Sequence, residues 1–101
     1  MKYLLKDSDN SVKEELYNND KTPVIWSDVN TFSVILRGNY SKESVVTTTD
    51  TDGEFTYYVP STFASLNTRA SVYIELSFDN SNFPDNEENV KQKIYDVIFK
   101  E

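Results

Sequence analysis

The residues from Val72 to Phe78 alternate strictly between apolar and polar side chains. The apolar positions are Val72, Ile74, Leu76 and Phe78, and the polar ones are Tyr73, Glu75 and Ser77. A period of two is the spacing of a β-strand, in which successive side chains point to opposite faces. The segment is therefore predicted to be an antiparallel strand with one face buried and the other facing water.

Other segments have the same β character. Thr31 to Arg37 is rich in β-branched and aromatic residues and ends at Gly38, which predicts a second strand. Val90 to Phe99 predicts a closing strand, and Tyr3 to Leu5 predicts a short first one. The stretch from Ser11 to Tyr17 fits either a helical turn or a strand. The apolar run Pro23–Trp26 begins with a proline, which suits the first residue of a strand or a sheet edge.

A tight hairpin is predicted where Asp52-Gly53 separates two β-prone runs, 44–51 and 54–60. Asp-Gly suits a type I′ turn, because both central positions of that turn need positive φ. A two-residue loop pairs Thr48 with Tyr57 and Val46 with Val59. This register places one set of side chains on a common core-facing side: Val46, Thr48, Phe55, Tyr57 and Val59.

Two connections follow the hairpin. Residues 61–67 predict a compact link with one helical turn, its start capped by a Ser or Thr hydroxyl. Residues 79–89 are polar and contain Pro84, so we expect a surface loop there.

A chain of 101 residues predicts one domain, and six to eight short antiparallel strands joined by turns predict an all-β sandwich. Without cysteine there is no disulfide, so the core depends on packed side chains: Phe32, Phe55, Ile74, Leu76 and Ile98. Because the last strand ends close to Glu101, two alternatives stay open for residues 1–101. They form either a complete protein or the N-terminal domain of a longer one.

The sequence contains no histidine and no cysteine, which removes the usual general base, the thiolate nucleophile and the soft metal ligands. We therefore expect no enzyme, no catalytic residue, no cofactor and no metal site. The segment beginning at Asp50 resembles part of a calcium loop, but Phe55 stands at the sixth position, where glycine is needed, and Ser61 at the twelfth, where glutamate is needed.

The formal net charge of −7 argues against nucleic acid and anionic membrane as partners, because both require a basic surface. No apolar run is long enough for a secretory signal or a transmembrane helix. The simplest explanation of the acidic composition is that it keeps the protein soluble. Two alternative explanations are binding to a dedicated basic partner and mimicry of DNA.

Seven tyrosines and Trp26 suggest a surface for binding, since such rings anchor protein interfaces and stack on sugars. Tyr57, Tyr73 and Tyr95 fall within the alternating strands, which predicts structural roles for them. Tyr17, Tyr40 and Tyr58 are expected to be exposed, so they are the candidate partner contacts.

The order of these segments resembles the N-terminal domain of upper baseplate proteins from tailed phages of Gram-positive bacteria. The resemblance covers most of the chain and is carried by five segments: 3–10, 30–37, 51–60, 70–76 and 93–99. It implies an immunoglobulin-like sandwich, in agreement with the strand count.

The same resemblance implies a non-catalytic role in the virion, at the tail baseplate, after synthesis in the host cytoplasm. The domain would dock onto the baseplate hub and support receptor-binding proteins, so its partners would be other tail proteins or further copies of itself. Two other functions stay open beside this one. They are a carbohydrate-binding module, based on the tyrosines, and an acidic inhibitor that imitates DNA.

Overall fold

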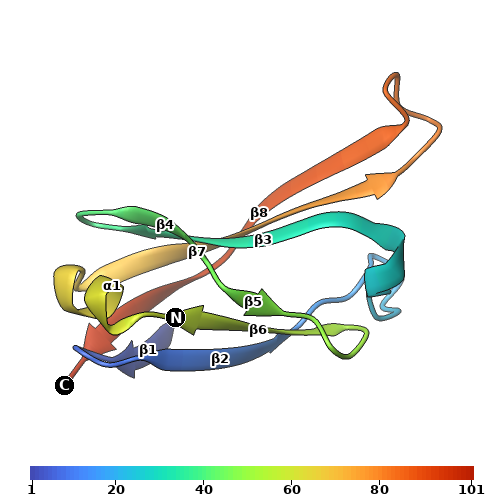
Figure 1. Cartoon of the computed structure of the whole chain (residues 1–101). Coiled ribbons are helices and arrows are strands. Elements are labelled where there is room, and N and C mark those ends of the chain that lie inside the picture. Colours follow the sequence, from blue (N-terminus) through green and yellow to red (C-terminus); the bar gives the residue numbers. More distant parts are fainter.

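The structure of the protein, a computed structural model, describes all residues from Met1 to Glu101 and consists of two packed β-sheets (Figure 1). The strands are β1 (Lys2–Leu5), β2 (Asn10–Glu15), β3 (Val29–Gly38), β4 (Lys42–Val45), β5 (Thr47–Thr48), β6 (Glu54–Val59), β7 (Arg69–Asp79) and β8 (Glu87–Lys100). Helix is confined to a 3₁₀ turn, η1 (Trp26–Asp28), and to α1 (Ser61–Leu66). The ambiguous segment after Ser11 is a strand. The all-β sandwich is confirmed.

The strand order is that of an immunoglobulin-like sandwich. One sheet has the order β1-β8-β7-β3-β4 and the other has the order β2-β6-β5. Strands β8, β7 and β3 correspond to the G, F and C strands of that fold, and β2, β6 and β5 correspond to B, E and D. All pairs are antiparallel except that of β1 with β8, which is parallel. No helix in the structure is both long enough and apolar enough to cross a membrane.

The core lies between the two sheets and consists of 15 buried residues. The alternating positions of β7 supply Val72, Ile74 and Leu76, as their period predicts. From β8 the buried residues are Val97 and Phe99, so the prediction that Ile98 is a core residue is wrong. Ile98 shares a face with Arg69, its neighbour on β7, on the outer side of the sheet.

Strands β7 and β8 form one long hairpin that extends beyond the second sheet (Figure 1). Because β8 begins at Glu87, the expected loop of residues 79–89 is shorter than predicted, and the turn covers only 80–86. The pairing shifts by one residue between Val72 and Tyr73, which leaves Ile94 as the extra residue of a bulge in β8. We call the part of the hairpin beyond this bulge the arm. It makes the molecule elongated, with extents of 46 × 26 × 20 Å.

The predicted hairpin around Asp52-Gly53 is wrong in its turn type and its register. Gly53 has a φ of 76°, whereas Asp52 is not among the residues with positive φ, so the turn is not type I′. Thr47 pairs with Tyr57, one residue away from the predicted register. A shift of one residue exchanges the two faces of a strand. Val46 is consequently 71% exposed, and Val45 is buried instead.

The segment from Lys42 to Thr48 is not one continuous strand but crosses from one sheet to the other. Its first part, β4, pairs with β3, and its second part, β5, pairs with β6. Val46 lies at the crossing, where its carbonyl accepts a hydrogen bond from the amide of Tyr58. The sequence shows an unbroken β-prone run because both parts are strands, and it does not show where the sheet changes.

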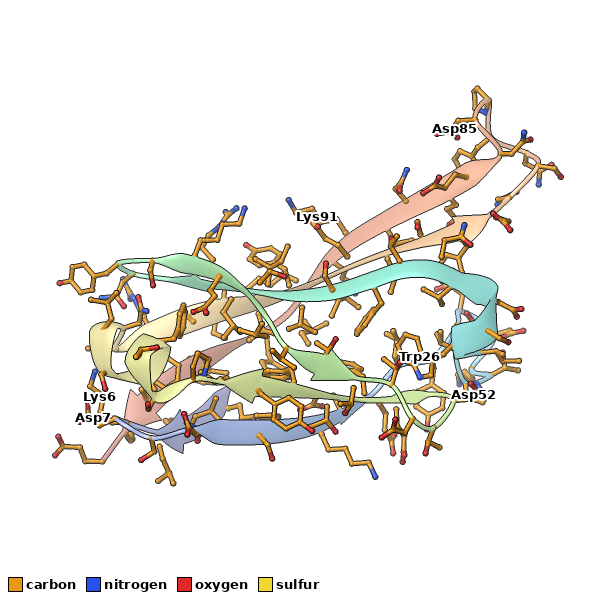
Figure 2. All side chains as sticks on the ribbon, viewed as in Figure 1. Lys6, Asp7, Trp26, Asp52, Asp85 and Lys91 are labelled. Atoms are coloured by element: carbon orange, nitrogen blue, oxygen red, sulfur yellow. The ribbon has the colours of Figure 1, made fainter.

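Trp26 explains why the Asp52-Gly53 turn departs from the prediction. Its backbone amide donates to a carboxylate oxygen of Asp52 at 3.0 Å, and its indole N–H donates to the carbonyls of Thr51 and Glu54, both at 2.9 Å. The turn is therefore held by a tertiary contact (Figure 2). The predicted strand over Pro23–Trp26 is absent. Pro23 makes only an isolated bridge, and η1 begins at Trp26.

Helix α1 is capped from outside, not by its own hydroxyls. The amide of Ser61 donates to a carboxylate oxygen of Asp9 at 2.7 Å, and no Ser or Thr of the helix supplies a cap. At the other end, the ammonium of Lys6 donates to the carbonyls of Ala64, Ser65 and Asn67. Negative charge at the start of a helix and positive charge at its end are both favourable. The β1–β2 turn thus clamps both ends of α1.

Candidate docking face

The outer side of the five-stranded sheet forms a broad face that no other element covers. Side chains directly opposite one another in the pairing register share a face, and the buried positions of β3 and β7 define the inner one. The outer positions follow from it. As far as Ser33, Glu75 and Lys91, they are Ser33, Ile35 and Arg37 of β3; Lys42 and Ser44 of β4; Arg69, Ser71, Tyr73 and Glu75 of β7; Lys91, Lys93, Asp96, Ile98 and Lys100 of β8; and Tyr3 and Leu5 of β1. We call this set the docking face. Closer to the hairpin tip the outer side continues with Thr31, Ser77, Asp79, Glu87 and Asn89, which are left out of the set.

The docking face concentrates the basic side chains of an acidic protein. Six of the ten Lys and Arg residues lie on it, although the whole chain has a formal charge of −7. The two carboxylates within this set are both neutralised, Glu75 by Lys91 at 3.2 Å and Asp96 by Lys93 at 3.0 Å. Two further carboxylates, Asp79 and Glu87, lie on the same side of the sheet near the hairpin tip. Figure 2 shows Lys91 pointing outward from this sheet. The remaining surface is correspondingly more acidic than the composition suggests.

Apolar and aromatic groups lie between these charges. Tyr3 and Leu5 are each 60% exposed at the β1 edge. The ammonium of Lys100 lies 4.6 Å from the centroid of the Tyr3 ring, and the guanidinium of Arg37 lies 5.3 Å from that of Tyr73. Cations over ring faces are held by the ring quadrupole while remaining available to solvent. The face thus includes aromatic residues and arginines, which are among the residue types enriched in protein interfaces.

A groove of about 450 Å³ lies at the end of the docking face near Gly38 and Asn39. Arg37 and Arg69, the only arginines in the chain, both line it, together with Asp96. A hydrogen bond from Ser71 and the nearby ammonium of Lys93 lower the pKa of the Asp96 carboxyl. Neither arginine forms an ion pair with a carboxylate of the chain. Both guanidinium groups are free to bind a carboxylate from outside.

The loop that carries Asn39 and Tyr40 is fixed from below by Asn67. This buried amide accepts from the backbone N–H groups of Tyr40 and Ser41 and donates to the Ser41 hydroxyl and the Phe63 carbonyl. Gly38 packs directly against the Asn67 side chain, where any Cβ would collide with the amide. The groove end of the docking face is therefore rigid.

One partly buried polar cluster links strands of both sheets. Tyr95 donates to Glu14 at 2.9 Å and accepts from Tyr57 at 2.7 Å, and Lys2 binds the same carboxylate at 2.8 Å. Burial raises the pKa of Tyr57 to about 12, and burial together with the Tyr57 hydrogen bond raises the pKa of Tyr95. Both phenols stay neutral near pH 7. The cluster ties β6, β8, β2 and β1 together.

The three predicted contact tyrosines are exposed but are not brought together. Tyr17 follows β2, Tyr40 lies in the β3–β4 turn, and Tyr58 faces outward from β6. Tyr58 pairs with Ser11 near the start of β2, about 20 Å along that strand from Tyr17. None of the three lies on the docking face, and none of the five main surface depressions is lined by two of them. No group of three or more acidic side chains is placed to hold a metal ion.

The alternation of residues within the strands, and not the distribution of tyrosines, is the sequence feature that points to the docking face. Once β7 is recognised as a half-buried strand, its outward residues follow directly as Arg69, Ser71, Tyr73 and Glu75. The same alternation in β3 gives Arg37 as outward. What the sequence does not show is that these strands are neighbours in one sheet.

The comparisons with known proteins add no relative to this description. No protein-family model, no curated protein and no solved structure matches the chain.

Proposed function

We propose that this chain is a non-catalytic assembly domain of a phage tail baseplate, which binds a neighbouring tail protein through the docking face. The observation that supports a binding role is the gathering of six basic side chains with exposed aromatic and apolar groups on one sheet of an acidic protein. The resemblance of the segment order to upper baseplate proteins supports the choice of partner and the place in the virion.

The partner surface is expected to be acidic, with at least one carboxylate that enters the groove between Arg37 and Arg69. An arginine can bind a carboxylate through two parallel hydrogen bonds, which fixes orientation as well as adding affinity. Long-range attraction between the basic face and an acidic partner accelerates association and makes the rate depend on salt.

Two other functions rank below this one. A carbohydrate-binding module needs rings that converge on one sugar, and the exposed tyrosines lie on separate elements. The indole N–H of Trp26 is also occupied, because it donates to two carbonyls. A DNA mimic needs an acidic surface, and here the docking face interrupts that surface with six cations.

The test is co-expression of the chain with the products of the genes that adjoin its own, followed by measurement of binding. The Arg37→Glu/Arg69→Glu variant should lose about tenfold or more in affinity for its partner. Lys13→Glu/Lys21→Glu is the matched control, because it changes the net charge equally at exposed sites outside the docking face. A chain that binds none of these products and is absent from purified phage particles would overturn the proposal.

A further inference from the structure

Strand β8 has one edge that is mostly unpaired. Strand β7 covers one side of β8 over nearly its whole length, whereas β1 covers the other side only from Val97 to Lys100. From Glu87 to Asp96 no strand lies on that side. An open edge of this kind presents backbone N–H and C=O groups that can pair with another chain.

The accessible part of this edge is a regular seven-residue stretch in the arm. It runs from Glu87 to the bulge at Ile94, and it contains neither proline nor glycine. Seven residues exceed the length of an average strand. The arm extends past the three-stranded sheet (Figure 1), so another strand can approach. Asp85 marks its tip in Figure 2.

We propose that a second copy of this chain pairs with the edge, antiparallel to it, about a two-fold axis that passes between the two Val90 residues. In this register Glu87 of each copy lies opposite Lys93 of the other, Glu88 lies opposite Gln92, and Asn89 lies opposite Lys91. Glu87 and Lys93 share the outer face of the sheet in each copy, so their side chains meet across the new strand pair.

The charges select this register over its neighbours. A two-fold axis at Lys91 places Lys91 against itself, and an axis at Gln92 places Lys91 against Lys93. Like charges directly opposite one another destabilise a sheet. An axis at Asn89 leaves Lys93 beyond the end of the partner strand and shortens the ladder to residues 87–91. Only the axis at Val90 gives seven paired residues with both lysines opposite Glu or Asn.

The register with the axis at Val90 also explains how Lys91 and Lys93, which lie on the open edge, are compatible with strand pairing. Lysine on an open edge normally discourages association with other strands. Here Lys91 and Lys93 exclude strands that offer cations or the wrong register, while the chain's own Glu87 is complementary to Lys93. The resulting dimer joins two five-stranded sheets, with both docking faces on the same side. It does not depend on the proposed baseplate function.

The test is sedimentation of the full chain over a range of concentrations. The wild-type protein should pass from its 11.7 kDa monomer to twice that mass as concentration rises. Glu87→Lys should weaken the dimer by about tenfold or more, because two attractive pairs become repulsive. Lys93→Glu should do the same, and the Glu87→Lys/Lys93→Glu double variant should restore the dimer.

The matched control is Glu43→Lys, an equal change of charge on β4, the opposite edge strand of the same sheet, which should leave the dimer unchanged. Amide hydrogen exchange gives a second readout, since protection of residues 87–93 should increase with concentration. Unfolding midpoints show whether each variant is folded. A wild-type chain that stays monomeric at about 1 mM, a Glu87→Lys variant that dimerises as the wild type does, or a double variant without recovery would overturn the proposal.

Discussion

Strands β7 and β8 belong to two contrasting regions of the same molecule. Near their Arg69 and Lys100 ends they form the centre of the sandwich, where Val72 and Val97 are completely buried. In the arm the same two strands have water on one edge, and residues 81–86 at the tip are all exposed. The bulge at Ile94 separates the two regions.

The comparison teaches that strand pairing alone does not make a region stable. Both regions have a continuous ladder between β7 and β8. In the sandwich the second sheet removes apolar surface from water, and such burial is the dominant favourable term in folding. In the arm full burial of apolar side chains is limited to Ile74 and Leu76, and Phe78 and Val90 are only partly buried. We therefore expect substitutions in the sandwich to change the free energy of unfolding strongly, and those at the partly buried and exposed positions of the arm to change it little.

Phe99→Ala should have the largest effect. Phe99 is 5% exposed in the sandwich part of β8, so truncation leaves a cavity and removes a buried ring, with a loss of about 3 to 4 kcal/mol in the free energy of unfolding. Val90→Ala removes two methyl groups at a partly buried site of the arm and should lose about 1 kcal/mol. Urea unfolding measures both. Equal losses would contradict the contrast.

Gly38→Ala should follow, with a loss of about 3 kcal/mol. The added methyl group collides with the Asn67 amide, which is buried and cannot move without breaking four hydrogen bonds. Asn67→Ala in the Gly38→Ala background supplies the control, because it removes the collision. The double variant should therefore lose less than the sum of the two single losses. Strict additivity would show that the two sites are independent.

Tyr95→Phe should cost about 2 kcal/mol, because it leaves the fully buried Tyr57 hydroxyl without its acceptor. Tyr57→Phe should cost less, since Tyr95 can still donate to Glu14. Urea midpoints at neutral pH measure the difference. Equal midpoints for the two variants would contradict the direction assigned to the hydrogen bond.

The same pair predicts a loss of stability in alkali. In the folded chain the pKa of Tyr57 is raised from 10.0 to about 12 by burial, and that of Tyr95 is raised as well. The unfolded chain therefore releases these protons first, so stability is fully present below pH 10 and decreases as the pH rises from about 10 to 12. Each single Phe variant should show a shallower decrease. A wild-type unfolding midpoint that stays constant up to pH 12 would contradict this prediction.

Much of the fold could be predicted because local periodicity and burial agree. The alternation in β7 is sufficient by itself to identify its buried face, and the all-β class follows from several such segments. The predictions failed where tertiary contacts overrule local preference. The Asp52-Gly53 turn is held by Trp26, and α1 is capped by Asp9 from another turn. Such contacts join residues far apart in the sequence, and neither partner alone signals the other.

The candidate site was predictable only in part. Exposure of Tyr17, Tyr40 and Tyr58 was predicted correctly, since each lies in a turn or on the outer side of a strand. The sequence does not show whether these tyrosines lie close together, nor which residues form the docking face, because both depend on which strands are neighbours. The docking face arises from β3, β7 and β8 lying side by side, although about 30 residues separate Arg37 from Arg69.

Phe83→Ser should have the smallest effect and gives the sharpest test of the arm. Phe83 lies in the tip turn and is 43% exposed, although its size and apolar character would suit a core. Because no second sheet covers the tip, its loss should change the free energy of unfolding by less than about 0.5 kcal/mol. Phe63→Ser is the matched control, since Phe63 is 2% exposed and packs on Phe99 with ring centroids 6.0 Å apart. A loss at Phe83 that approached the one at Phe63 would mean that the arm folds back onto the body in solution.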